Sequence, residues 1–174
     1  MADRGLSGIL LAGGASSRFG SPKASARFAG ETLAERAWRL LGEVCTERIV
    51  VGGDGLADPG TGPVAAIAVG LRAAAHEVAV VVPVDMPLLT AAALRQLARA
   101  CREAAVAQAG PLPCAVARRA LPAFESGERR LRTVLAGLDT ARVELEEGLL
   151  ANVNEPADLH RIAATEDDRT RGEA

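Results

Sequence analysis

Apolar residues along the chain form two kinds of pattern. Short continuous apolar runs predict buried strands, and apolar positions three or four residues apart predict helices. Strands are expected at 8–12, 48–51, 78–84, 105–109, 114–117 and 141–145, with a further short apolar segment at 149–153. Helices are expected at 33–43, 63–75, 90–103, 119–126, 128–138 and 156–164. Because the two kinds alternate nearly throughout, the pattern predicts an α/β fold, a three-layer α/β/α sandwich with a mostly parallel, Rossmann-like sheet.

Capping and proline positions sharpen several of these boundaries. Thr32 followed by Glu35 has the spacing of a capping box. Pro63 suits the first turn of a helix, and Asn154 is the expected cap of the last one. Pro83 cannot donate to a sheet ladder, so the central strand is expected to stop pairing there.

The composition bounds the class of protein. The chain has 174 residues, of which 49% are hydrophobic and 24% charged, as in ordinary globular proteins. This length predicts a single domain at 1–164 and a charged tail at 165–174 that frays. The net charge is −2, and positive and negative residues are interspersed along the chain. This distribution gives no sign of a basic surface that would bind nucleic acid or an anionic membrane. No apolar run could span a bilayer, and the first eight residues do not resemble a signal peptide, so we expect a cytoplasmic protein.

The cysteines and histidines give no sign of a metal cluster. Cys45, Cys101 and Cys114 are far apart, no C-x-x-C pair occurs, and the chain has two histidines. The pattern is that of reduced cysteines in a cytosolic protein.

The first predicted strand leads into the most informative stretch, GILLAGGASSRFGSPK at 8–23. Gly13 and Gly14 remove Cβ atoms where the strand ends, so backbone N–H groups could approach a bulky anion. Two cations follow: the planar guanidinium of Arg18 and the ammonium of Lys23, which is carried on a flexible side chain. Together these features predict a phosphate-binding loop.

The spacing of this loop differs from both common phosphate loops, G-x-G-x-x-G and G-x-x-x-x-G-K-[ST]. It resembles instead the signature L-A-G-G-x-S-x-R-x-G-x-x-K of nucleotidyltransferases of the sugar-nucleotide pyrophosphorylase type. The alternative is an ordinary glycine-rich turn with incidental surface cations. The agreement of Ser16, Arg18, Gly20 and Lys23 with the signature favours the first interpretation.

A carboxylate is expected at the same edge of the sheet. The loops that follow parallel strands gather at one edge, which would carry 13–23, 52–62 and Asp85. A carboxylate opposite an anion-binding loop suggests Mg²⁺, which prefers one or two carboxylates plus substrate phosphates. The alternative is a turn or cap aspartate before Pro87. No base stands at motif spacing from Ser16 or Ser17, so direct transfer to an oxygen of a second substrate is expected.

Later segments resemble one branch of these enzymes, the molybdenum cofactor guanylyltransferases. GTGPVAAI resembles their G-P-L-A-G-[IM], VPVDMPLL their P-x-D-x-P, SGERRLRTVL their G-E-R-R, and ANVNEPADL their N-V-N-T-P-E-[ED]-L. The segments occur in the family's order and cover residues 8 to about 161. The resemblance implies a nucleotide-diphospho-sugar transferase type of fold, GTP as donor, Mg²⁺ as metal and molybdenum-bearing molybdopterin as acceptor. Transient contact with proteins of cofactor synthesis or molybdoenzyme maturation stays an open expectation.

The resemblance also implies roles for individual residues. The nucleotide site would comprise Leu11, Ala12, Gly13, Gly14, Lys23, Gly52, Asp85 and an aspartate before G-P, for which Asp54 and Asp58 compete. Lys23, Arg18 and Asp85 would be catalytic, with Asp85 binding the metal. Asn152 and Asn154 would lie near the pterin, where a buried amide can both donate and accept; a turn and a helix cap are the alternative. Arg129 and Arg130 could hold the acceptor phosphate or lie on a solvated helix face.

Departures from the family's motifs keep other functions open. Gly52 stands where the family usually has asparagine or another polar residue, Ala66 replaces a glycine, and the loop to Gly62 is short. Since this loop would choose the base, a molybdopterin cytidylyltransferase or another cofactor nucleotidyltransferase is an alternative. A non-catalytic nucleotide-binding accessory protein is another.

Overall fold

The structure of the protein is a computed structural model that describes residues 5–13 and 23–163. Gly14, Arg18 and the predicted tail at 165–174 lie outside the described residues.

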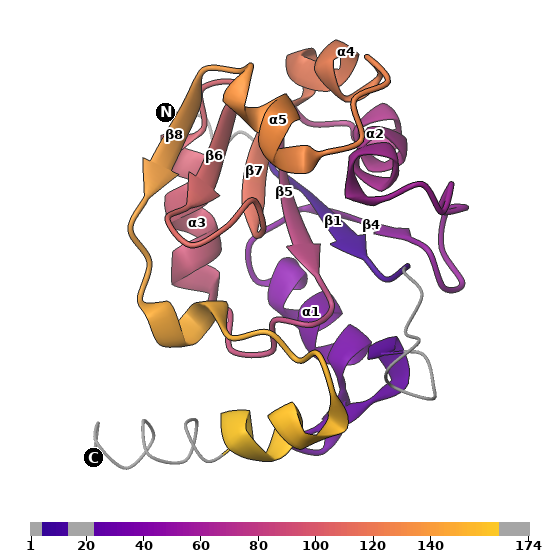
Figure 1. The fold of residues 1–174 in the computed structure, drawn as a ribbon, viewed down its shortest axis with the longest axis vertical. Helices are drawn as coiled ribbons and strands as arrows, with labels where there is room; N and C mark the ends of the chain where they lie inside the picture. Colours follow the sequence, from indigo (N-terminus) through magenta and orange to yellow (C-terminus); the bar gives the residue numbers. More distant parts are fainter. Residues whose placement is uncertain (1–4, 14–22, 164–174) are drawn as a thin grey trace.

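A six-stranded sheet in the order β4-β1-β5-β7-β6-β8 forms the centre of the molecule (Figure 1). The strands are β1 (Ser7–Leu11), β4 (Glu47–Val51), β5 (Val78–Pro83), β6 (Ala104–Ala107), β7 (Cys114–Ala117) and β8 (Thr140–Val143). β1 pairs in parallel with both β4 and β5, and β6 with β8, whereas β7 is antiparallel to both of its neighbours. The sheet is therefore mostly parallel, as predicted, and β7 is the reversed strand.

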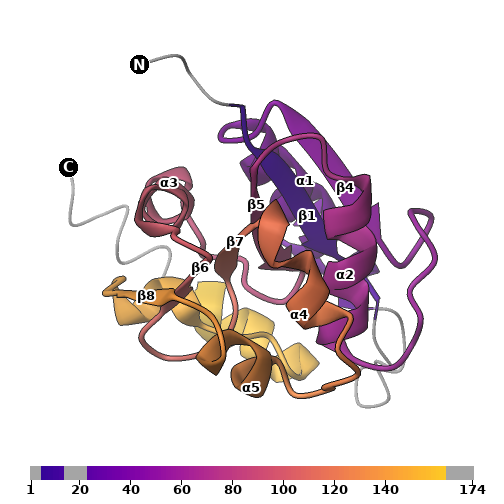
Figure 2. The same ribbon diagram turned by 90° about the horizontal axis from the view of Figure 1, so that it is seen from above.

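Helices cover both faces of this sheet, which gives the predicted three layers (Figure 2). The helices are α1 (Leu33–Gly42), α2 (Pro63–Ala73), α3 (Ala91–Ala100), α4 (Leu121–Phe124) and α5 (Leu131–Ala136), and a last one spans 156–163. Short 3-10 turns form η1 (Lys23–Ser25), η2 (Arg118–Ala120) and η3 (Glu147–Leu150). α2, α4 and α5 pack on one face, and α1 and α3 on the other.

Strand residues alternate between the two cores. Ile9 of β1 packs with α2, while its neighbour Leu10 packs with α1; Val81 and Val80 of β5 divide in the same way. Successive side chains of a strand point to opposite faces, and here both faces are covered. This is why the central strands read as continuous apolar runs.

Most predicted boundaries fall within a few residues of the observed ones. The capping box at the start of α1 is present: the Glu35 amide donates to Thr32 Oγ1, and the Thr32 amide donates to the Glu35 carboxylate. β5 ends at Pro83 as expected. α3 ends at Ala100, three residues before the expected end, and the predicted helix at 119–126 is a 3-10 turn followed by the short α4, which ends at Phe124. The apolar segment at 149–153 begins within η3.

The C-terminal segment forms a third, smaller core. Val153 and Ile162 pack with Phe28 and Leu33, beside the hairpin of β2 (Arg27–Phe28) and β3 (Glu31–Thr32). The Val153 amide also donates to the carbonyl of Asp85, at 2.8 Å. The segment around 152–154 is thereby held against the loop that follows β5.

Candidate functional site

A cleft of about 780 Å³ opens at the carboxyl ends of β1, β4 and β5. α1 and α2, which connect these strands, cover opposite faces of the sheet, so the strand order reverses at β1. Ligands of open α/β sheets bind at such a reversal. The lining includes the predicted residues Leu11, Ala12, Gly13, Lys23, Gly52, Asp58 and Asp85.

The backbone of this cleft requires a glycine at position 52. Its φ is +88°, and a Cβ atom built on it would lie 2.4 Å from the amide nitrogen of Gly13. The Gly52 amide donates to the carbonyl of Leu56 at 2.8 Å, which folds the loop back on itself. A polar side chain, as the resembling family usually has here, would not fit between these two loops.

The structure separates the two candidate aspartates. Asp58 is half-buried and lines the cleft, whereas Asp54 is exposed and is not among the lining residues. Asp58 Oδ1 accepts a hydrogen bond from the amide of Gly60 at 2.8 Å.

Lys23 and Asp85 meet across the cleft. Lys23 Nζ lies 3.4 Å from Asp85 Oδ2, and the two side chains are 23% and 25% exposed. Lys23 belongs to η1 and Asp85 follows β5, so the fold joins the end of the glycine loop to the end of the central strand. A partly open pair of this kind can exchange its internal contact for contacts with a ligand.

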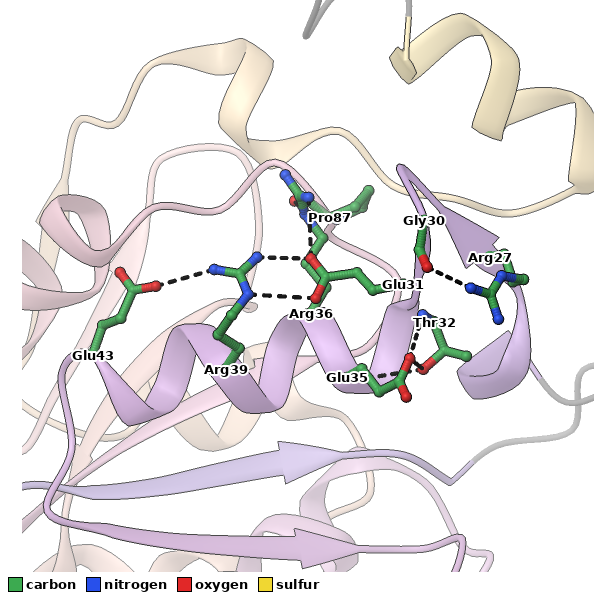
Figure 3. A network of polar contacts seen from close by, with 9 residues as sticks. All are labelled: Arg27, Gly30, Glu31, Thr32, Glu35, Arg36, Arg39, Glu43 and Pro87. Atoms are coloured by element: carbon green, nitrogen blue, oxygen red, sulfur yellow. Dashed lines mark hydrogen bonds and ion pairs between the residues drawn. The ribbon is translucent and has the colours of Figure 1, made fainter.

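The loop after Asp85 is fixed from the side of α1 (Figure 3). Arg36 Nε donates to the carbonyl of Pro87 at 2.6 Å, and the Arg36 guanidinium lies 5.1 Å from the centre of the Phe28 ring. Glu31 pairs with Arg36 and Arg39, and both contacts lower the pKa of its carboxyl, that with Arg39 most. This network holds the end of the Asp85 loop in place.

A second hollow of about 310 Å³ adjoins the first. Pro83, Asp85 and Leu112 line both. The second hollow is further lined by Met86, Ala109, Gly110, Pro111, Arg132, Leu150 and Asn152. Asp85 therefore stands where the two hollows meet.

The two predicted asparagines behave differently from the expectation. Asn152 lines the second hollow, but Asn154 does not, and both are exposed, so the expected burial is wrong. Asn154 is also not the side-chain cap of the last helix. Its amide and that of Glu155 instead donate to Oδ2 of buried Asp158, at 2.7 and 2.9 Å.

Arg129 and Arg130 lie outside the second hollow. Both side chains are exposed, and their amides donate to the carboxylate of Glu128 at 2.8 and 2.7 Å, which lowers the pKa of that carboxyl. Arg129 lines a separate hollow beside α2. The helix predicted from 128 begins at Leu131, because Arg130 before it is extended, with a ψ of 110°.

Arg132 and the 109–112 loop were not identified as site residues by sequence patterns. They reach this edge because β7 inserts between β5 and β6 in reversed direction. A third cation in the run Arg-Arg-Leu-Arg was the available signal, but the spacing alone did not say which arginine faces the site.

The cysteines take no part in this arrangement. All three are free thiols, and burial raises the pKa of Cys45 and Cys101 to about 11 and that of Cys114 further. Within residues 5–13 and 23–163, no group of three or more His, Cys, Asp or Glu side chains could hold a metal alone. No helix in the same part of the chain is both long and apolar enough to cross a membrane.

Comparison with known proteins agrees with this geometry. Residues 8–144 match the family model of the MobA-like NTP transferase domain. The chain is 38% identical to a probable molybdenum cofactor guanylyltransferase of Opitutus terrae, covering 73% of this chain and 72% of that protein. It is 36% identical to a molybdenum cofactor guanylyltransferase of Xanthomonas euvesicatoria, covering 89% and 93%.

A solved structure shares the fold. The molybdopterin-guanine dinucleotide biosynthesis protein A of Archaeoglobus fulgidus superimposes with a TM-score of 0.75 at 20% identity, covering 93% of this chain and 99% of that one. The fold and the cleft thus define a nucleotidyltransferase of the Rossmann-like α/β class. Within that class, the chain belongs to the MobA-like NTP transferase family.

Proposed function

We propose that this protein transfers GMP from GTP to the terminal phosphate of molybdenum-bearing molybdopterin, releasing pyrophosphate. The observation that carries the proposal is that Asp85 lines both hollows at once. A transfer between two bound substrates needs one point where donor and acceptor meet, and Asp85, paired with Lys23, would supply that point. The names of the relatives supply the identities of the two substrates.

The first hollow is assigned to the nucleotide. The backbone of Gly13 and the ammonium of Lys23 would hold phosphate oxygens, and Asp58 would accept from a donor group of the nucleoside. Leu11 and Ala12 would line the site without donating, because the Ala12 amide already donates to the carbonyl of Val51 at 2.9 Å. Gly14 and Arg18, outside the described residues, belong to the same proposed loop. At Gly52 the backbone would lie close to the nucleotide, and no side chain would contact it.

The residues at the junction fit a magnesium ion. Mg²⁺ takes one or two carboxylates together with substrate phosphates, and the partly exposed Asp85 carboxylate between the hollows offers such a donor. When bound, the ion would neutralise charge on the triphosphate and stabilise the transition state. Lys23 would then turn from Asp85 to the phosphates.

The reaction needs no protein nucleophile or base. A phosphate monoester is largely dianionic at neutral pH, so its oxygen can attack the α-phosphorus directly. That attack forms one P–O bond and breaks the bond between the α-phosphorus and the β-bridging oxygen. The departing pyrophosphate takes its proton from solvent. The protein's work is to align the two substrates and to offset their charge.

The test is a transfer assay with purified protein, Mg²⁺ and molybdopterin, in which GTP, CTP and ATP are compared as donors. We expect pyrophosphate release with GTP and a guanine dinucleotide product identified by mass spectrometry. Preference for CTP would keep the reaction but reassign the base. Absence of transfer and of binding for all three nucleotides would support an accessory protein instead.

A further inference from the structure

Arg132 is an arginine of the second hollow for which motif comparison gave no role. It is the second residue of α5, it is exposed, and it lines the hollow that also contains Asp85 and Asn152. It also lines a neighbouring hollow of about 230 Å³, together with Arg142. Arg132 therefore stands at the boundary between the two spaces.

The Arg132 guanidinium has no partner in the described parts of the chain. Some exposed arginines are engaged there, namely Arg39 with Glu31, Arg72 with Glu125, and Arg102 with Asp139, whereas Arg142 is like Arg132 in having no such contact among the described residues. No such ion pair or side-chain hydrogen bond involves Arg132 within residues 5–13 and 23–163. None of its five donors is taken up by a side chain or carbonyl of a described residue.

The charges around the second hollow favour an anion near Arg132. Among the described residues, Asp85 and Arg132 are its only charged lining residues, and the rest of the lining is mostly apolar. A planar guanidinium matches the oxygens of a phosphate in a two-pronged contact. The second hollow could therefore bind a phosphate monoester that carries a flat ring, with Arg132 contacting the phosphate and the apolar residues contacting the ring.

We propose that Arg132 binds the phosphate of the acceptor and orients it towards Asp85. The inference rests on the proposed function in taking the acceptor to be a phosphate monoester. It differs from the expectation for Arg129 and Arg130, neither of which lines this hollow. By this proposal Arg132 sets the affinity for the acceptor and leaves the affinity for GTP unchanged.

The first experiment separates KM values for the two substrates in Arg132→Ala, Arg132→Lys and Arg142→Ala. Arg142 is the matched control, because it is exposed and lines the neighbouring hollow but not the second one. We expect Arg132→Ala to raise the acceptor KM about 10- to 100-fold, with the KM for GTP within about twofold of wild type. Arg132→Lys should recover part of the loss, and Arg142→Ala should resemble wild type. Equal acceptor KM values in Arg132→Ala and wild type would overturn the inference while leaving the proposed function intact.

The second experiment does not depend on transfer. Protein saturated with Mg²⁺ and a non-hydrolysable GTP analogue, so that the donor phosphate site is filled, is titrated with inorganic phosphate. Arginine Nε–H resonances are followed by NMR. We expect the resonance that is missing in Arg132→Ala to shift on titration, and phosphate affinity to fall about tenfold or more in that variant alone.

The two experiments distinguish the possible failures. If wild-type protein does not modify molybdopterin but phosphate still binds through Arg132, the proposed acceptor is wrong and the phosphate site stands. If phosphate binds equally to wild type, Arg132→Ala and Arg142→Ala, the phosphate site is wrong whatever the activity.

Discussion

The carboxylate of Asp58 lies directly against the backbone of Gly13. A Cβ atom built on Gly13 would lie 1.8 Å from Asp58 Oδ2, a separation that no real Cβ atom adopts. The other oxygen of the same carboxylate accepts from the Gly60 amide at 2.8 Å, so the local turn fixes the aspartate in this position. Gly13, after β1, and the loop that follows β4 are thereby fitted to each other in the lining of the first cleft.

This contact yields a prediction that separates Asp58 from Asp54. Asp58→Asn should weaken GTP binding about 10- to 100-fold, since it removes a charged acceptor worth roughly 1.5–3 kcal/mol. The asparagine oxygen can still accept from Gly60, so the loop should keep its conformation. Calorimetric titration with GTP and Mg²⁺ measures the change. Asp54→Asn, at an exposed position outside the cleft lining, is the control and should bind like wild type. Equal losses in both variants would contradict the assignment of Asp58.

A second prediction concerns the glycine at the end of β4. Gly52→Ala should destabilise the protein by roughly 2–4 kcal/mol, because it combines a positive φ with a collision against Gly13. Gly30→Ala isolates the first of these effects. Gly30 has a φ of +89° but nothing within 4 Å of a built Cβ atom, so about 1 kcal/mol is expected there. Urea denaturation of both variants gives the comparison. A Gly52→Ala variant no less stable than Gly30→Ala would show that the two loops can separate without cost.

The fold could be predicted where local chemistry and burial point the same way. The capping box of Thr32 and Glu35 and the proline start of α2 depend on neighbours only a few residues away. The run at 78–84 is apolar because both of its faces are covered. By contrast, the start of α5 was misplaced: Arg130 is extended, and the Glu128 carboxylate accepts from the Arg129 and Arg130 amides in the turn before the helix.

The candidate site residues could be named from the sequence where a strand end or a motif marks them, and not where they depend on how a loop turns. Asp85 follows a strand that the apolar pattern locates, and Lys23 stands at the end of a loop whose spacing resembles a known signature. The choice between Asp54 and Asp58 depends on how the glycines of the loop between β4 and α2 turn, which no local pattern determines. Arg132 depends on the insertion of β7 beside β5, a long-range pairing that apolar runs do not reveal.

A third prediction tests the junction of the two hollows. Asp85→Asn should reduce transfer by about three orders of magnitude or more, because it removes the charge proposed to hold Mg²⁺. Lys23→Gln should lower kcat by a similar factor, because it removes the positive charge proposed to offset the negative charge of the phosphates. Both side chains are about a quarter exposed, so neither variant should lower the stability by more than about 1 kcal/mol. Pyrophosphate release and thermal melting measure the two effects. Substantial activity of Asp85→Asn in Mg²⁺ would rule out the metal assignment.

The last prediction concerns stability towards acid, and it comes from the opposite edge of the sheet. Ser7 Oγ donates to Glu47 Oε2 at 2.5 Å, and the Ala75 amide donates to the same oxygen at 2.9 Å. The His76 amide in turn donates to Ser7 Oγ at 3.2 Å. These bonds tie the beginnings of β1 and β4 to the turn before β5, and Ser7 is fully buried.

The hydrogen bond from Ser7, followed by that from Ala75, lowers the pKa of Glu47 below its usual value of 4.5. A carboxyl with a lowered pKa stabilises the folded state above its unfolded pKa, and this contribution is lost as the pH falls through the folded-state value. Glu47→Gln should therefore be less stable than wild type by roughly 1–2 kcal/mol at pH 7, and the difference should shrink below about pH 4.

Urea denaturation between pH 3 and about pH 7 tests this difference in stability. Glu43→Gln, which alters only an exposed pair with Arg39, should change stability by less than about 0.5 kcal/mol at any of these pH values. A Glu47→Gln deficit that stays constant down to pH 3 would mean that the lost stability comes from side-chain packing and not from the ionised carboxylate.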